Sequence, residues 1–167
     1  ITEAIRQGCG EYGVTEPTLI LEPGRYITGD AQLLLLRVGA VKNRPGVAKF
    51  ALTEGGILST SFMPVVEYHQ IFVANKMKNP SKESYRICGR VCTTADYLYK
   101  GVELPALEEG DILAVMDTGA YFVGTSTNFA YPRPPVVMVK NGRSQLIRAR
   151  ESHEDLLKND MFPVLPL

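Results

Sequence analysis

Hydrophobic and polar positions form short runs along most of the chain, and turn residues separate them. Strand-length apolar or alternating runs occupy residues 17–24, 31–44, 47–56, 65–77, 84–92 and 110–124. Several of these runs end at glycine, proline or asparagine, as in "NRPG" and "NPS". Short strands between regular turn signals are typical of an all-β sandwich or barrel. The pattern therefore predicts a mainly β chain, with the run 31–44 as a buried strand.

Helical patterns stand only at the two ends. Residues 1–13, "ITEAIRQGCGEYG", predict a helix that the glycines stop, and residues 152–160 predict a short helix capped by Ser152. The dipeptide "NG" within 133–150 predicts a hairpin, and residues 93–100 suggest a turn or a short helical piece. Because a natural domain seldom begins inside an uncapped helix, we expect the chain to be part of a longer protein.

Composition narrows the function classes. The 167 residues suffice for one well-buried domain. Eighteen basic residues balance eighteen acidic ones, so no global charge would recruit nucleic acid or an anionic membrane. No apolar run approaches the roughly 18 residues that span a bilayer, and no segment resembles a signal peptide. Neither a nucleic-acid partner nor a membrane is expected, and the location expected is cytoplasmic.

The three cysteines carry the first candidate chemistry. Cys88 and Cys92 are four residues apart, and neither histidine lies at ligand spacing from them, so no metal site is expected. A disulfide within one extended segment would join sulfur atoms that lie too far apart. Cys88 is interpreted as a small buried hydrophobe. Cys92 stands where a loop begins, and it is either a proton-transfer group or a second structural thiol.

Two further stretches suggest a ligand site. In "LILEPGRYITG", Gly24 permits close backbone approach and Arg25 offers a fixed positive charge, which together suit a phosphate. A surface turn with a salt bridge would show the same residues. In "DTGAYFVG", Tyr121 follows two small residues at a strand end. This tyrosine would contact a ligand or belong to the core.

Taken in order, these motifs resemble the C-terminal part of pyridoxal-phosphate-dependent amino-acid decarboxylases of the alanine-racemase-like fold type. This family includes diaminopimelate, ornithine and arginine decarboxylases, and the diaminopimelate branch is the most similar. The resemblance runs from "PTLILEPGRYITGDAQLLLLRV" through "GRVCTTADYLYKGVELPALEEGDILAVMDTGAY" to "STNFAYPRPPVVMV" and "IRARESHEDLL". It covers nearly the whole chain.

The resemblance implies two domain parts. Residues 1–25 would be the last helix and strand of an N-terminal β/α barrel, and residues 26–167 a C-terminal Greek-key β-barrel or sandwich with a short terminal helix. The lysine that binds the cofactor belongs to an early barrel strand and matches no lysine here. The resemblance therefore implies a carboxy-lyase as a full-length homodimer with shared active sites, and an inactive chain when these 167 residues stand alone.

The resemblance also assigns roles to residues. The phosphate-binding turn of the cofactor site would comprise Glu22, Pro23, Gly24 and Arg25. Arg25 would also face the substrate, and Tyr121 would lie beside the pyridoxal phosphate. Cys92 would reach into the partner subunit's active site and give a proton to the substrate carbon after carbon dioxide leaves.

Three positions depart from the diaminopimelate branch. Met63 replaces an arginine, Glu67 a tyrosine, and Thr93 a glutamate, all residues that recognise the distal end of the substrate. Methionine cannot hold a carboxylate as a guanidinium does. We therefore expect a basic or neutral amino acid in place of diaminopimelate. The alternatives are racemase-type chemistry on the same fold, a catalytically inactive regulatory homologue, and a free-standing β-domain for association.

Overall fold

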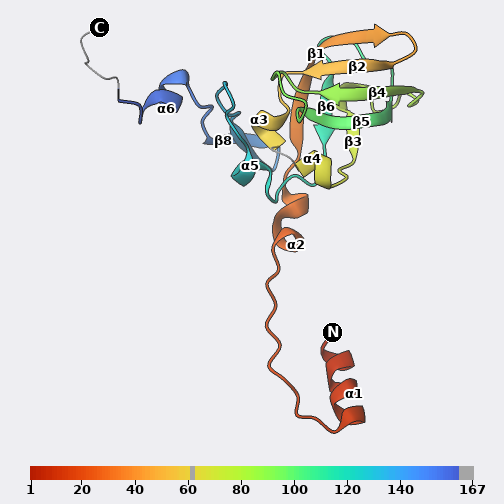
Figure 1. The fold of residues 1–167 in the computed structure, drawn as a ribbon, viewed down its shortest axis with the longest axis vertical. Coiled ribbons are helices and arrows are strands. Elements are labelled where there is room, and N and C mark those ends of the chain that lie inside the picture. Colours follow the sequence, from red (N-terminus) through yellow and green to blue (C-terminus); the bar gives the residue numbers. More distant parts are fainter. Residues whose placement is uncertain (61–62, 162–167) are drawn as a thin grey trace.

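Six strands form one curled sheet in the computed structural model, which describes residues 1–60 and 63–161 (Figure 1). Their order is β3-β6-β1-β2-β4-β5, and all neighbouring pairs are antiparallel except β2 and β4. The strands are β1 (Leu34–Arg44), β2 (Ala48–Thr53), β3 (Ile71–Val73), β4 (Glu83–Cys88), β5 (Tyr97–Leu104) and β6 (Ile112–Val115). The mainly β prediction is confirmed.

The sheet is barrel-like because β1 changes partner along its length. Residues 34–37 pair with β6, whereas residues 38–44 pair with β2. The two outer strands also approach each other, since the Tyr99 hydroxyl on β5 donates a hydrogen bond of 2.6 Å to the carbonyl of His69, just before β3. The sheet is therefore nearly closed.

The hydrophobic core fills the inside of this sheet. Side chains of β1 alternate, so Leu36 and Val38 are buried while Leu35 stays 58 % exposed. The strand predicted over 31–44 is found as β1, but only one face of it is buried, because its other face does not meet the core. The buried cluster comprises Leu36, Val38, Ala51, Ile71, Val73, Tyr85, Ile87, Leu98, Tyr99, Leu104, Leu107, Leu113 and Val115.

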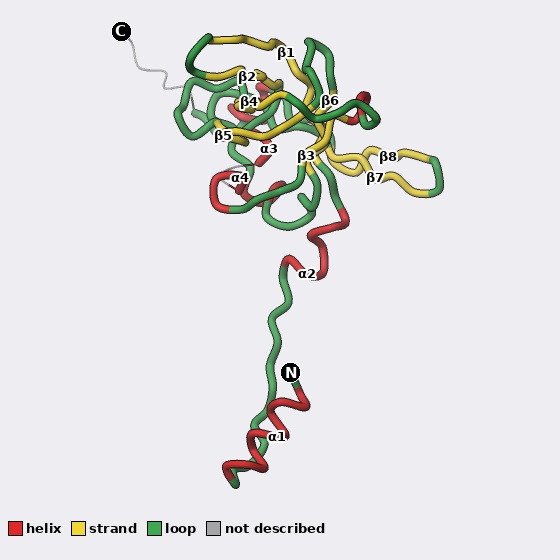
Figure 2. The backbone as a smooth tube through the Cα atoms, turned by 90° about the vertical axis from the view of Figure 1, so that its right-hand side faces the viewer, coloured by secondary structure: helices red, strands yellow, loops and turns green. Residues whose placement is uncertain are grey.

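A two-stranded hairpin extends to one side of the barrel (Figure 2). It consists of β7 (Val136–Lys140) and β8 (Arg143–Arg148). Asn141 and Gly142 join the strands, both with positive φ (51° and 72°), as the tight hairpin turn requires. After it, α6 (His153–Leu157) begins at Ser152, whose side chain and the Asp155 carboxylate cap each other's backbone amides. Both sequence predictions are confirmed.

Short helices also stand inside the chain, where the pattern predicted none. These are α2 (Arg25–Thr28), α3 (Ile57–Thr60), α4 (Met63–Val66) and α5 (Phe122–Thr125), with single 3₁₀ turns η1 (Gly29–Ala31) and η2 (Ala74–Lys76). A single helical turn is too short to show a 3.6-residue period. The expectation of helix only at the two ends was therefore wrong.

The strand boundaries also differ from two predictions. Of the two alternatives predicted for residues 93–100, the turn is found, closed by a hydrogen bond from the Asp96 amide to the Thr93 carbonyl, and the helical piece is not, because β5 begins at Tyr97 and pairs with β4. The run 65–77 yields only the three residues of β3. Tertiary pairing decided both cases, as is common for short apolar runs.

The N-terminal part stands apart from the sheet (Figure 1). Helix α1 (Thr2–Tyr12) ends at Gly13, which has the left-handed conformation (φ 61°) expected of a helix stop. Residues 14–24 then run without helix or strand to α2. The strand predicted over 17–24 is not formed, and Ile20 and Leu21 are 79 % and 62 % exposed. A strand needs a hydrogen-bonded neighbour, and no described strand of this chain pairs with this segment.

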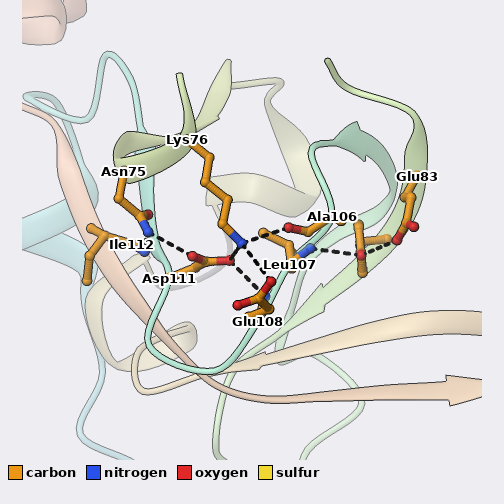
Figure 3. Close-up of polar contacts among 9 residues, drawn as sticks. Asn75, Lys76, Glu83, Ala106, Leu107, Glu108, Asp111 and Ile112 are labelled. Carbon is orange, nitrogen blue, oxygen red and sulfur yellow. Dashed lines mark hydrogen bonds and ion pairs between the residues drawn. The ribbon is translucent and has the colours of Figure 1, made fainter. Parts of the chain in front are cut away.

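A buried polar cluster joins η2 to the turn before β6 (Figure 3). The Asp111 carboxylate accepts hydrogen bonds of 2.8 Å from Lys76 Nζ, 2.8 Å from Asn75 and 2.7 Å from the Glu108 amide. Burial opposes the charged carboxylate, but these hydrogen bonds hold the pKa of Asp111 below its ordinary value. The cluster fixes one end of the barrel.

Two kinds of structural feature are absent from residues 1–60 and 63–161. None of the helices there has the length and apolar character needed to cross a bilayer. The same residues contain no group of three or more histidine, cysteine, aspartate or glutamate side chains placed to hold a metal ion.

Candidate functional site

Arg25 begins α2, immediately after Gly24. Its guanidinium forms an ion pair of 2.5 Å with Glu67 and lies over the ring of Tyr121, with the central carbon 4.9 Å from the ring centroid. Arg25 and Glu67 are 35 % and 32 % exposed. The guanidinium is thus held in place by a carboxylate and an aromatic face, while part of it stays open to solvent.

The loop after β6 brings Tyr121 to this position. Its backbone is strained at Asp117 (φ 58°) and Tyr121 (φ 70°), both non-glycine residues in the left-handed region. The Gly119 amide bonds to the Gly29 carbonyl at 2.9 Å, and a Cβ at Gly119 would lie 1.7 Å from the Thr28 carbonyl oxygen. Only glycine permits this contact, which ties the tyrosine loop to α2.

His69 contacts the same cluster through Glu67. Its Nδ1 lies 3.0 Å from the carbonyl oxygen of Met116, and its Nε2 lies 3.1 Å from the second carboxylate oxygen of Glu67. The ring is buried and packs edge-to-face on Phe122, with centroids 4.8 Å apart. Because a carbonyl oxygen only accepts, Nδ1 must donate to it. Glu67 therefore contacts both His69 and Arg25.

The arrangement fits a phosphate-bearing ligand. A Cβ on Gly24 would lie 3.5 Å from the Tyr121 hydroxyl, so a side chain at this position would fill the space between the turn and the phenol. The Arg25 guanidinium supplies positive charge at the same place. The Ile27 amide of α2 donates to the Gly24 carbonyl at 3.1 Å, so the amides of Arg25 and Tyr26 are the donors that could face a ligand there. Space, charge and donors therefore coincide at the Gly24–Arg25 turn.

Cys92 lies on a different loop, between β4 and β5. Its side chain is exposed, whereas Cys88 on β4 is half-buried. Burial, and after it the nearby charge of Asp96, raises the pKa of the Cys88 thiol, which keeps this thiol neutral. The two cysteines therefore differ in environment. In the described residues Cys92 shares no hydrogen bond with the Arg25 cluster.

The structure brings together only some of the sequence candidates. It groups Gly24, Arg25, Glu67 and Tyr121. Glu22 and Pro23 are exposed in the extended segment, Met63 opens α4, and Thr93 lies in the Cys92 loop. Sequence reasoning missed His69, since a lone histidine carries no motif and its partners come from distant loops.

This chain is similar to known proteins in sequence and in fold. The profile described as "Pyridoxal-dependent decarboxylase, C-terminal sheet domain" matches residues 25–119, more than half of the chain. The chain belongs to this family. The family prediction made from the motifs is thereby confirmed, together with its fold.

Individual relatives carry the name diaminopimelate decarboxylase. The protein of Methanothermobacter thermautotrophicus is 37 % identical over 166 residues, which are 98 % of this chain and 38 % of the relative. That of Bacillus subtilis is 35 % identical over 164 residues, 96 % of this chain and 37 % of the relative. The chain therefore spans a little over a third of the length of these relatives.

A crystal structure shows the same fold. The chain is similar to diaminopimelate decarboxylase from M. jannaschii with a TM-score of 0.82 and 33 % identity, over 97 % of this chain and 38 % of that one. A second structure of that enzyme, in complex with L-lysine, is similar to the same degree, with a TM-score of 0.82 and 34 % identity.

Proposed function

We propose that the full-length protein containing this chain is a pyridoxal-phosphate-dependent amino-acid decarboxylase, and that this chain supplies part of its active site. The observation that carries the proposal is the grouping of Gly24, Arg25 and Tyr121, which offers space, charge and an aromatic face to one phosphate-bearing ligand. When bound, the cofactor would supply the electron sink that loss of a carboxylate requires.

The residues of this chain would have separate tasks. Arg25 and the α2 amides hold the phosphate, and the carboxylate of Glu22 and the ring of Pro23 shape the approach to that turn. Tyr121 fixes the guanidinium of Arg25 and covers one side of the ligand. The Cys92 Sγ–H gives its proton to the substrate carbon that has lost carbon dioxide.

The substrate we propose is a basic or neutral amino acid. Met63 has no hydrogen-bonding group for a distal carboxylate, and Thr93 carries no charge. The Glu67 carboxylate, which pairs with Arg25 and stays 32 % exposed, would suit a cationic or hydrogen-bond-donating side chain better than a second carboxylate. The second candidate is diaminopimelate, because the relatives at 35–37 % identity bear that enzyme's name.

The assembly we propose is a cytoplasmic homodimer in which Cys92 completes the partner's active site. Exposed apolar residues on the extended segment and on β7–β8, such as Ile20 and Val139 (79 % and 72 % exposed), suit burial against further protein. The free state of all three cysteines agrees with a reducing compartment.

The function is tested by carbon dioxide release from a panel of amino acids with the full-length protein and pyridoxal phosphate. Cys92→Ala should lower kcat by about 100-fold or more, the usual contribution of a positioned proton donor. Cys88→Ala, on the neighbouring strand, is the matched control and should leave kcat unchanged. Absence of carbon dioxide release from every amino acid would contradict the proposal.

The substrate proposal has its own test. Glu67→Gln should raise KM for a cationic amino acid by about tenfold, the effect of about 1.4 kcal/mol, and leave KM for a neutral amino acid unchanged. Efficient turnover of meso-diaminopimelate by the wild type, unaffected by Glu67→Gln, would assign the protein to the second candidate.

A further inference from the structure

Asp96 is a buried carboxylate that the chemistry above does not use. It is 4 % exposed, and within the part of the chain that the structure describes it has no ion-pair partner. An isolated charge in the protein interior is costly unless hydrogen bonds compensate for it. The groups that bond to the Asp96 carboxylate therefore indicate its role.

The hydrogen bonds of Asp96 all go to backbone groups around the Cys92 loop. One carboxylate oxygen accepts from the Val91 amide and the other from the Ile57 amide, each at 2.8 Å. Its own backbone closes the loop, because the Asp96 carbonyl accepts from Gly89 at 2.9 Å and its amide donates to Thr93 at 3.1 Å. Asp96 thus fixes the residue directly before Cys92 and joins this loop to α3.

Two glycines make room for the carboxylate. A Cβ at Gly89 would lie 2.2 Å from one Asp96 oxygen and 2.3 Å from the other. A Cβ at Gly56, whose φ is +103°, would lie 2.1 Å from the same group. Side chains at either position would displace the carboxylate, so both Gly56 and Gly89 are needed for Asp96 to occupy its place.

We infer that Asp96 is the positioning residue of the Cys92 thiol: it sets the loop so that this cysteine stands outward while Cys88 stays half-buried. The inference rests on the proposed function for the role of Cys92 and concerns a residue that the resemblance did not assign. Asp96 acts through the loop backbone, since its oxygens bond to the amides of Val91 and Ile57 and not to sulfur.

The test uses Asp96→Asn in the full-length protein. Asparagine keeps the size of the side chain but offers an NH₂ group to one of the two amides, so one hydrogen bond is lost. Hydrogen exchange at Ile57 or Val91 should quicken by about 10- to 100-fold, and kcat should fall by about tenfold or more while KM stays within twofold. A general loss of stability would not separate kcat from KM.

Asp111→Asn is the matched control, since Asp111 is also 4 % exposed but bonds to Lys76 and Asn75 and not to the Cys92 loop. It should lower stability without changing exchange at Val91 or the reactivity of Cys92. Trypsin separates the thiols for mass analysis, because Arg86 and Arg90 place Cys88 and Cys92 in different peptides. After Asp96→Asn, iodoacetamide labelling of Cys88 should rise severalfold.

Gly89→Ala keeps the inference falsifiable if Asp96→Asn does not fold. It should produce the same exchange and kcat changes, because it displaces the same carboxylate. Unchanged exchange at Ile57 and Val91 in both variants would overturn the inference. If the wild type releases no carbon dioxide, the proposed function fails, whereas the exchange and labelling measurements still decide the role of Asp96.

Discussion

Two clusters of this protein pair a carboxylate with a cation, and they differ in their access to solvent. Asp111 and Lys76 are 4 % and 17 % exposed, and their polar atoms bond to other groups of the barrel (Figure 3). Arg25 and Glu67 are each about one third exposed. The carboxylate of the first cluster is buried, whereas the second leaves part of a guanidinium open to solvent. The difference separates a cluster that holds the fold from one suited to a ligand.

The largest effect is expected when the closed cluster is broken. Asp111→Ala should lower the free energy of unfolding by about 3 kcal/mol, because it removes the buried acceptor shared by Lys76, Asn75 and the Glu108 amide. Urea denaturation measures this loss. Glu108→Ala removes the other carboxylate near Lys76. Because the Glu108 side chain is 82 % exposed, this change should lower the free energy of unfolding by about 0.5 kcal/mol or less. Equal effects of the two changes would remove the distinction drawn between buried and open pairs.

An intermediate effect is expected from the pair of Arg133 and Glu151, which joins loop 128–133 to the chain before α6. Hydrogen bonds from the Arg133 side chain and then from its amide lower the pKa of Glu151 from 4.5 to about 2. A lowered pKa stabilises the folded state above pH 4.5, and this contribution is lost as the pH falls toward 2. Between pH 5 and pH 3 the wild type should lose about 2 kcal/mol more than Glu151→Gln. Parallel pH profiles of the two proteins would argue against the pair.

The smallest effect on stability is expected at the open cluster. Glu67→Gln should change the free energy of unfolding by less than about 1 kcal/mol, since the ion pair with Arg25 is partly solvated and screened. Thermal unfolding at low and high salt measures it. A loss as large as that of Asp111→Ala would mean that Glu67 holds the fold and would weaken the comparison between the clusters.

Local signals predicted the elements with local causes. The Asn141–Gly142 turn, the Ser152 cap and the Gly13 stop each depend on residues adjacent in sequence, and each is found. Strand β5 and the exposure of residues 14–24 depend on which strands meet in space. No period within "YLYKGVEL" or "TLILEP" contains that information.

The residues of the candidate site also separate into those with a local sequence signal and those defined by contacts with distant residues. Arg25 and Tyr121 could be named from their motifs, and the structure places them in contact. His69 and Asp96 could not, because what makes them significant is an acceptor on another element: Met116 for the first, and the amides of Ile57 and Val91 for the second. Buried polar residues of this kind are recognised by their partners and not by their neighbours in sequence.

The parallel pairing of β2 and β4 has a consequence for the order of folding. Strands β1 and β2 meet across a tight turn, but β2 can meet β4 only after residues 54–82 have crossed from one to the other. Closing so long a connection costs chain entropy before any pairing repays it, and such contacts form late. Glu67 and His69 lie on that crossover, and the Cys92 loop follows β4 directly. We therefore expect the β1–β2 and β4–β5 hairpins to form first, and the β2–β4 pairing, with the crossover that carries Glu67 and His69, to become ordered later.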